Sequence, residues 1–430
     1  MTGPLSLISV LLTFFLAGGL WVGFSLFAIG IISLETFKNI KVDRFLAGDI
    51  WGTATAIELV TLPLFILMGE ILFRTRLSEN LFSGLAPFVR RLPGRLLHVN
   101  ILGCTMFAAV SGSSAATTAT VGRITITEMR SRGYDDKLIM GSLAGAGTIG
   151  FLIPPSIPLI IYGVLAEISI LDLFIAGIIP GLILAAMFMI YIGFVSILHP
   201  QLTASAGPST TLYYKMLALS KLLPTILLIT LIIGSMYLGF ASVTEAAAIG
   251  VLGAAILAAF EGQFTINIVW RTLLGTVRTC SMIGLILTGA MFLSKAMARL
   301  GIPTDVANGI ESMDLGPFTL ILLLMFFYLA LGCFLDGLST IVMTLPVTLP
   351  LVVAAGFDPV WFGIFLIVTI EMAQITPPIG FNLFVIKSLT GHSIMRIAAA
   401  AVPFCGIMVL LVLLLILFPE LATWLPKSIR

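Results

Sequence analysis

Two short segments each place adjacent prolines within a long apolar stretch. Residues 149–158 read IGFLIPPSIP, and residues 372–381 read MAQITPPIGF. Proline removes a backbone donor and clashes with the preceding turn, so each pair is expected to break a helix. A helix broken inside a membrane exposes carbonyl oxygens and half-helix ends, which can bind Na⁺ or face an anionic group. Carbonyl and hydroxyl oxygens suit this hard cation without the burial of a full negative charge.

Two further segments combine small residues with side-chain oxygens. They are VSGSSAATTAT at 110–120 and DGLST at 336–340. Together with the proline breaks they predict two related ion sites around a central substrate. The residues expected beside the substrate are Ser114, Pro154, Asp336, Pro377 and Asn382. The alternative is that Ser, Thr and Gly here only allow helices to pack closely.

Ionisable residues within apolar segments cost about 2.5–3.5 kcal/mol each at a helix centre, so each one requires a reason. Asp336 lies in one of the oxygen-rich segments and is the strongest functional candidate. Glu371 and Lys387 flank the second proline break, where they could instead snorkel or pair within the bundle. Glu245, within SVTEAAAIG, suits a helix start, where a preceding serine or threonine would cap the helix.

The composition places the chain in a membrane. Of its 430 residues 59% are hydrophobic and only 10% are charged, with a mean hydropathy of +1.17, whereas soluble domains carry about 25% charged residues. The first 16 residues, MTGPLSLISVLLTFFL, are expected to be a retained membrane segment rather than a signal peptide. No P-loop motif occurs, and the four cysteines and three histidines lack metal-ligand spacing. We expect no transition metal, no cofactor apart from Na⁺, and no nucleic-acid partner.

The apolar segments predict membrane helices of about 20 residues. The sequence also indicates an internal duplication, in which the second half repeats the unit of the first. Residues near the start of the first half recur in the second half at an offset of 220, and later residues recur at an offset of 223. For example, Gly133-Tyr134-Asp135 matches Gly356-Phe357-Asp358 at 223. The predicted organisation is a first repeat (1–198), a cytoplasmic linker (199–221) and a second repeat (222–430). The expected elements are hairpins at 98–122 and 317–352, broken helices at 138–165 and 360–388, a single apolar segment at 46–73, a helix at 272–294, and a turn between two short helices within FLAGGLWVGF.

Charge predicts that the two repeats are inverted. The first hairpin has basic residues on both flanks, which is typical of cytoplasmic loops. The second is flanked by Asp305, Glu311, Asp314 and Asp358, which suits the outer face. Five apolar segments between the two hairpins are expected to cross the membrane. Because five is an odd number, the hairpins should open to opposite sides of the membrane. The predicted fold is an all-α polytopic membrane protein with about ten transmembrane helices and two re-entrant hairpins, the layout of secondary transporters.

At these residues the chain resembles the large membrane subunit of tripartite ATP-independent periplasmic (TRAP) transporters. The resemblance covers essentially the whole chain. The looser match LDGLST lies at 335–340, and the specific motifs are VSGSSAATTATVG at 110–122, IPPSIPLIIYGVLAEISI at 153–170, LFIAGIIPG at 173–181, SVTEAAAIGVL at 242–252 and ITPPIGFNLFV at 375–385.

The resemblance implies an elevator-type fold with scaffold and transport domains in a bacterial inner membrane. It further implies sodium-coupled import of a small organic acid, such as a C4-dicarboxylate, a sugar acid including sialic acid, or a keto acid. The implied partners are a small four-helix membrane subunit and a periplasmic solute-binding protein. The implied sodium-site residues are Ser111, Gly112, Ser113, Gly150, Ile153 and Ser156 in one half and Gly337, Ser339, Thr340, Ala373, Thr376 and Ile379 in the other.

Three other functions are alternatives to this one. A stand-alone inverted-repeat carrier of anions or carboxylates would share the layout but work without a binding protein. A membrane enzyme would need a catalytic dyad, and Ser111-Gly112-Ser113 has no histidine in an equivalent span. A channel would lack a fixed ratio between ion and substrate fluxes.

Overall fold

The chain is helical throughout the part that the structure describes. This computed structural model describes residues 3–38, 42–75, 77–203, 211–311 and 316–429. Within those ranges there are twenty α-helices and three short 3-10 helices (η1–η3), and there is no strand. The all-helical fold class predicted from the sequence is therefore confirmed.

The first half of the chain provides ten of the α-helices. In order, the elements are α1 (Gly3–Ala17), α2 (Val22–Phe37), α3 (Val42–Ala54), η1 (Ile57–Val60), α4 (Thr61–Phe73), α5 (Leu77–Val89), α6 (Leu97–Ser111), α7 (Ser114–Ser131), α8 (Asp136–Thr148), η2 (Ile149–Phe151), α9 (Ile157–Ala166), α10 (Ile170–Leu198) and η3 (Pro200–Leu202). The turn predicted within FLAGGLWVGF is confirmed, because it separates α1 from α2. Polar side chains cap the N-terminal ends of several helices. At α8, for example, the Asp135 carboxylate accepts a hydrogen bond from the Leu138 N–H at 3.1 Å.

The second half provides the other ten. They are α11 (Leu212–Tyr237), α12 (Val243–Phe260), α13 (Ile266–Arg299), α14 (Ile302–Glu311), α15 (Pro317–Gly332), α16 (Gly337–Ala354), α17 (Pro359–Gln374), α18 (Phe381–Thr390), α19 (Ile394–Leu417) and α20 (Glu420–Ile429). Ser242 and Glu245 form a capping box at the start of α12, with the Ser242 N–H donating to Glu245 Oε2 at 2.7 Å. The prediction that Glu245 lies at a helix start capped by a preceding serine or threonine is thus confirmed, with Ser242 as the cap.

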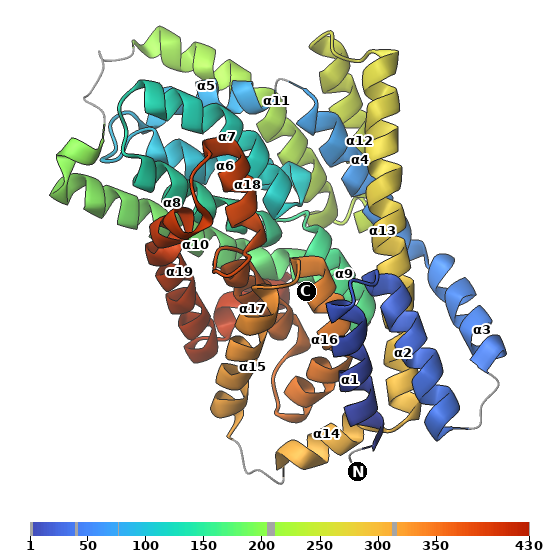
Figure 1. The fold of residues 1–430 in the computed structure, drawn as a ribbon. Helices are drawn as coiled ribbons and strands as arrows, with labels where there is room; N and C mark the ends of the chain where they lie inside the picture. Colours follow the sequence, from blue (N-terminus) through green and yellow to red (C-terminus); the bar gives the residue numbers. More distant parts are fainter. Residues whose placement is uncertain (1–2, 39–41, 76, 204–210, 312–315, 430) are drawn as a thin grey trace.

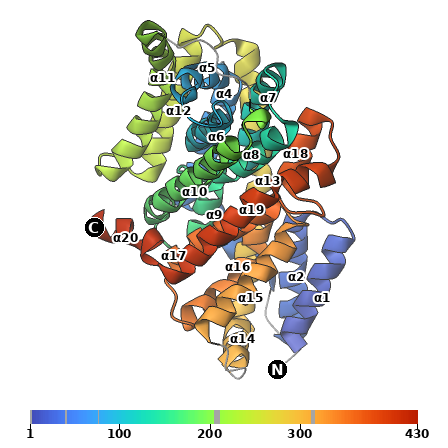
Figure 2. The same ribbon diagram turned by 90° about the vertical axis from the view of Figure 1, so that its left-hand side faces the viewer.

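Helix boundaries recur along the chain with the shift of 223 residues. The clearest pair is α7 at 114–131 and α16 at 337–354, whose ends differ by 223 at both termini. The first hairpin (α6–α7) lies in the upper half of both views and the second hairpin (α15–α16) in the lower half, with α5 beside the first and α14 beside the second (Figure 1, Figure 2).

Helices of one half pack against helices of the other half. The second helix of each hairpin contacts the last part of the other half's broken helix: α7 contacts α18, and α16 contacts α9. In the same way α2 packs on α13, and α12 packs on α4. This crossing places the first proline break in the interior of the bundle, whereas Pro377, Pro378 and Ile379 of the second break stay exposed.

Four predicted boundaries are wrong. The apolar segment at 46–73 is not one helix, because the chain leaves the helix after Ala54 and resumes through η1 and α4. The first hairpin ends at Ser131 rather than at residue 122, since TITEMRS continues α7 without a breaker. The helix predicted at 272–294 extends over Ile266–Arg299.

The predicted linker (199–221) is the fourth of these boundaries. Its last ten residues, Leu212–Lys221, belong to α11, because no proline or glycine interrupts LYYKMLALSK. Residues 204–210 of the linker and Asp314 lie outside the described residues. Two short helices with amphipathic sequences, α14 and α20, were missed because neither is long or apolar enough to be read as a membrane segment.

The described helices fit a membrane protein. Six of them are long and apolar enough to cross a bilayer, namely α10, α11, α12, α13, α16 and α19. The bent pair formed by α3 and α4 would make a seventh if it counts as one span. Shorter apolar helices of 10–17 residues include the arms of the hairpins and broken helices, such as α6, α9, α15, α17 and α18.

Candidate functional site

The tip of the first hairpin is a tight turn of small residues. α6 ends at Ser111, Gly112 takes a left-handed φ of 59°, and α7 begins at Ser114. Ser113 caps α7 by accepting a hydrogen bond from the Ala116 N–H at 3.4 Å. Ser111 and Thr117 share a hydrogen bond of 2.9 Å between their hydroxyls. A glycine is required at 112, because other residues are strained at positive φ.

The first proline break is confirmed as an interruption between α8 and α9. α8 ends at Thr148, η2 follows, and α9 begins at Ile157. Ser156 caps α9 through the Leu159 N–H at 3.4 Å and donates to the carbonyl oxygen of Phe151 at 2.5 Å.

The first tip and the first break meet backbone to backbone. The Ile157 N–H donates to the Gly112 carbonyl oxygen at 3.4 Å. A Cβ on Gly112 would lie 2.8 Å from the Pro155 carbonyl oxygen, and one on Gly150 would lie 3.1 Å from the Cα of Ser114. The structure therefore brings the two predicted oxygen-rich pieces of the first half together, and we call this place site 1.

The tip of the second hairpin is built around Asp336. Its Oδ2 accepts hydrogen bonds from the Leu338 N–H at 3.1 Å and the Ser339 N–H at 3.2 Å, so the carboxylate caps α16. The Asp336 carbonyl oxygen also accepts from the Thr340 hydroxyl at 2.9 Å. Asp336 is exposed, and its role toward substrate stays a prediction beside this capping role.

The second proline break separates α17 from α18. Thr376 donates to the Met372 carbonyl oxygen at 2.6 Å, and the Gly380 N–H donates to the carbonyl oxygen of Cys333 at 3.3 Å. The Gln374 amide donates to the carbonyl oxygens of Gly332 at 3.4 Å and Leu335 at 3.2 Å. The bonds from Gly380 and Gln374 connect the second break to the second tip, and we call this place site 2.

The two sites touch each other through Ser114 and Gly337. Ser114 Oγ lies 3.0 Å from the Gly147 carbonyl oxygen, 2.9 Å from Glu371 Oε2 and 2.7 Å from Asn382 Nδ2. A Cβ on Gly337 would lie 2.8 Å from the Phe151 ring. Each hairpin therefore contacts the broken helix of the opposite half as well as its own.

Burial differs sharply between the two sites. Pro154, Pro155 and Ser156 are all buried in site 1, where helix α10 covers the break so closely that a Cβ on Gly177 would lie 2.4 Å from the Leu152 carbonyl oxygen. In site 2, Pro377, Pro378 and Ile379 are exposed, and Ile379 is 40% exposed. The proline break of site 2 is therefore exposed at the surface of the chain, whereas that of site 1 is covered by α10.

The donor set of both sites consists mainly of neutral oxygens, which suit an alkali cation. Among the described residues no group of three or more His, Cys, Asp or Glu could hold a metal ion. Lys387 is exposed, with its Nζ 5.8 Å from the centre of the Phe384 ring.

Sequence reasoning underestimated Glu371 and missed Gln374. Both are buried, at 0% and 4% exposure, and both hydrogen-bond to a hairpin. The available signal was position: each lies within six residues of the proline pair, in a helix whose other residues are nearly all apolar. A polar side chain kept in such surroundings requires a partner.

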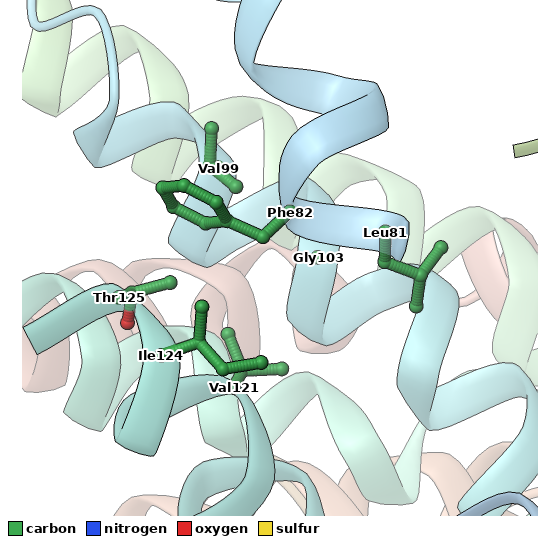
Figure 3. Close-up of a pocket in the computed structure, with 7 residues that line it drawn as sticks. All are labelled: Leu81, Phe82, Val99, Gly103, Val121, Ile124 and Thr125. Atoms are coloured by element: carbon green, nitrogen blue, oxygen red, sulfur yellow. The ribbon is translucent and has the colours of Figure 1, made fainter. Parts of the chain in front are cut away.

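An apolar pocket lies behind the first hairpin rather than at either site. Figure 3 shows its lining from α5, α6 and α7, which comprises Leu81, Phe82, Val99, Gly103, Val121, Ile124 and Thr125. No residue proposed to bind an ion or substrate lines it. The pocket is therefore a feature of packing between α5 and the hairpin.

The fold and the sites define a polytopic helical membrane transporter, in which paired hairpins and broken helices meet inside the bundle. Its family is shown by the match of residues 9–421 to the model of "Tripartite ATP-independent periplasmic transporter, DctM component". The chain belongs to this family of TRAP transporter large permeases, as its motifs predicted.

Relatives with established names cover nearly the whole chain. The C4-dicarboxylate TRAP transporter large permease protein DctM of Pseudomonas aeruginosa is 31% identical over 399 residues, which is 93% of this chain and 92% of that protein. The sialic acid TRAP transporter large permease protein SiaM of Vibrio cholerae is 29% identical over 413 residues, covering 96% of each. Both relatives are named as transporter subunits and not as enzymes.

A solved structure supports the fold. The YdaH transporter of Alcanivorax borkumensis superimposes with a TM-score of 0.66, covering 95% of this chain and 97% of that one, at 16% sequence identity. At this identity the likeness supports the architecture alone.

Proposed function

We propose that this protein is the large membrane subunit of a sodium-coupled importer of a small organic acid. Family membership supports secondary transport of organic acids, and the names of two relatives include a C4-dicarboxylate and sialic acid. Na⁺ binding is supported by one observation, the pairing of each hairpin tip with a proline break. This pairing brings neutral oxygen atoms together at two places.

The two sites would hold Na⁺ through the residues expected from the sequence. Site 1 would use Ser111, Gly112, Ser113, Gly150, Ile153 and Ser156, and site 2 would use Gly337, Ser339, Thr340, Ala373, Thr376 and Ile379. Several of these can act only through backbone carbonyls, which the broken helices leave free of regular helix bonds.

The substrate carboxylate would bind between the hairpin tips. Of the five residues expected there, Ser114 and Asn382 already share a buried hydrogen bond, whereas Asp336 and Pro377 lie at the exposed mouth of site 2. Pro154 is buried in site 1. The acid would be a C4-dicarboxylate, a sialic or other sugar acid, or a keto acid.

The partners follow from the tripartite family. A periplasmic solute-binding protein would deliver the acid, and a small four-helix membrane subunit would complete the complex in a bacterial inner membrane. This arrangement is favoured over a stand-alone carrier, because the matched family is defined as tripartite.

The proposed cycle needs no chemistry on the substrate. Na⁺ orders the tips, the acid binds between them, and a transport domain with compensated charge moves past a scaffold. Coupling requires that substrate binds less well without Na⁺, by a factor of about 5–150.

Uptake into vesicles tests this proposal. The complex with its small subunit and binding protein is reconstituted, and uptake of a radiolabelled C4-dicarboxylate and of sialic acid is measured under an inward Na⁺ gradient. We expect uptake of one of these acids that stops when choline replaces Na⁺. Equal uptake in choline with no other cation gradient would contradict the proposal.

A further inference from the structure

The carboxyl group of Glu371 is fully buried and has no part in the function proposed above. It lies in the last turn of α17 and is 0% exposed. Its Oε2 accepts a hydrogen bond from Ser114 Oγ at 2.9 Å, whereas Oε1 has no hydrogen-bond partner among the described residues. Because a buried carboxyl with an unpaired oxygen costs free energy, packing alone does not account for it.

Ser114 is the branch point to which Glu371 connects. Its hydroxyl accepts a hydrogen bond from Asn382 Nδ2 at 2.7 Å and lies within 3.0 Å of two acceptors, the Gly147 carbonyl oxygen and Glu371 Oε2. A hydroxyl group has a single proton, so Ser114 donates to one of these acceptors at a time. One acceptor belongs to the first broken helix and the other to the second.

This arrangement places Glu371 between the two candidate ion sites. Ser114 follows Ser113 of site 1 directly, and Glu371 precedes Ala373 of site 2 by two residues. An ion that orders the tip of the first hairpin would fix the Ser114 hydroxyl. The hydroxyl would in turn fix the carboxyl group and, with it, the end of α17.

The link exists on one side of the duplicated structure only. The shift of 223 residues places Gly337 opposite Ser114, Thr148 opposite Glu371 and Leu159 opposite Asn382. Gly337 and Leu159 have no polar side-chain atom, and the Thr148 hydroxyl donates to the Gly145 carbonyl oxygen of its own helix at 2.6 Å. The second hairpin therefore meets the first broken helix by apolar contact, through Phe151.

We propose that Glu371 is a positioning residue that couples occupation of site 1 to occupation of site 2 through the Ser114 hydroxyl. The inference rests on the proposed function, because it takes the two sites to bind Na⁺. It predicts that Na⁺ binding is cooperative and that the cooperativity depends on this one hydrogen bond.

The test is thermal unfolding of the purified full chain with its small subunit, titrated with NaCl at constant ionic strength made up with KCl. The wild-type Tm is expected to rise sigmoidally with Na⁺. In Ser114→Ala and in Glu371→Leu, the rise should become hyperbolic and require about 5–150-fold more Na⁺. The Tm in KCl alone reports any loss of fold separately.

Thr369→Val is the matched control. Thr369 is a buried residue of α17 whose hydroxyl donates only within its helix, to Phe365 O at 2.8 Å, so its titration should match the wild type. Sigmoidal titrations in both Ser114→Ala and Glu371→Leu would overturn this inference and leave the proposed function standing. A wild-type Tm that does not respond to Na⁺ would overturn both. If Glu371→Leu does not fold, the NaCl titration of Ser114→Ala alone tests the inference.

Discussion

At the scale of single residues, glycine allows the backbone segments of site 1 to approach each other. Gly112 combines a left-handed φ of 59° with a position where a Cβ would lie 2.8 Å from the Pro155 carbonyl oxygen. Gly133 has a similar φ of 78° with nothing within 4 Å of a Cβ. Substitution at either glycine would strain the backbone, but only at Gly112 would the new Cβ also clash with a neighbour. A comparison of the two positions therefore separates the two costs.

Gly112→Ala is expected to lower the Tm more than Gly133→Ala. Both changes carry about 1–2 kcal/mol of left-handed strain, but only the first also pushes the hairpin tip away from the proline break. Gly112→Ala should in addition abolish Na⁺-dependent uptake, whereas Gly133→Ala should retain it. Equal losses of Tm in the two variants would show that stability does not depend on the close approach of the first hairpin tip to the proline break.

At the scale of elements, an ion cluster joins three helix ends at the base of the first hairpin, at the ends of α7 and α8 that lie away from site 1. Arg130 at the end of α7 donates to both carboxylate oxygens of Asp136, at 2.8 and 3.0 Å. His392, between α18 and α19, lies 2.8 Å from Asp136 Oδ2. The hydrogen bond from Arg130, followed by that from His392, lowers the pKa of Asp136 below its usual value. The cluster thereby links the base of the first hairpin to α8 and to the second broken helix.

The pH dependence of stability follows from that lowered pKa. A carboxylate whose folded pKa is depressed stabilises the fold above its unfolded pKa of about 3.9, and this stabilisation is lost as the pH falls through the folded value. Asp136→Asn should therefore reduce the Tm at neutral pH and flatten the fall of Tm below about pH 4. Parallel Tm curves for variant and wild type from pH 7 to pH 3 would contradict this role.

Several elements could be predicted because their cause is local. The prolines at 154–155 and 377–378 break helices through their own ring geometry, and Gly19 ends the turn between α1 and α2 at a φ of 74°. The bend after Ala54 has no such marker, so hydropathy merged α3 with α4. The bond between Ser114 and Glu371 joins residues 257 apart, and only the crossing of the two halves reveals it.

At the scale of the whole molecule, the two proline breaks differ in accessibility. The first break is covered by α10, whereas residues 377–379 of the second are exposed. The duplicated sequence predicts two related sites, but it cannot predict which proline break is exposed, because that depends on how α10 packs over the first one.

Thiol labelling measures this difference. In a variant lacking Cys104, Cys280, Cys333 and Cys405, a cysteine at Ile379 should react with a maleimide many-fold faster than one at Ser156, whose side chain is 0% exposed. Both should label fully after denaturation in detergent. Equal rates before denaturation would show that the first break is as open as the second.

The long helix α13 has a further consequence for how the protein sits in lipid. Its 34 residues extend to about 51 Å at 1.5 Å per residue, which exceeds a hydrocarbon layer of about 30 Å. Exposed Arg271 and Arg278 lie toward one end, and Lys295 and Arg299 lie toward the other. The stretch between Arg278 and Lys295 spans about 26 Å along the axis, close to the thickness of the hydrocarbon layer. Lys295 pairs with Asp49 of α3, and the Arg299 guanidinium lies 4.0 Å from the centre of the Phe45 ring, so α3 holds both cations. The turns of α13 beyond Arg278 and Lys295 must therefore lie in water or along the membrane interface.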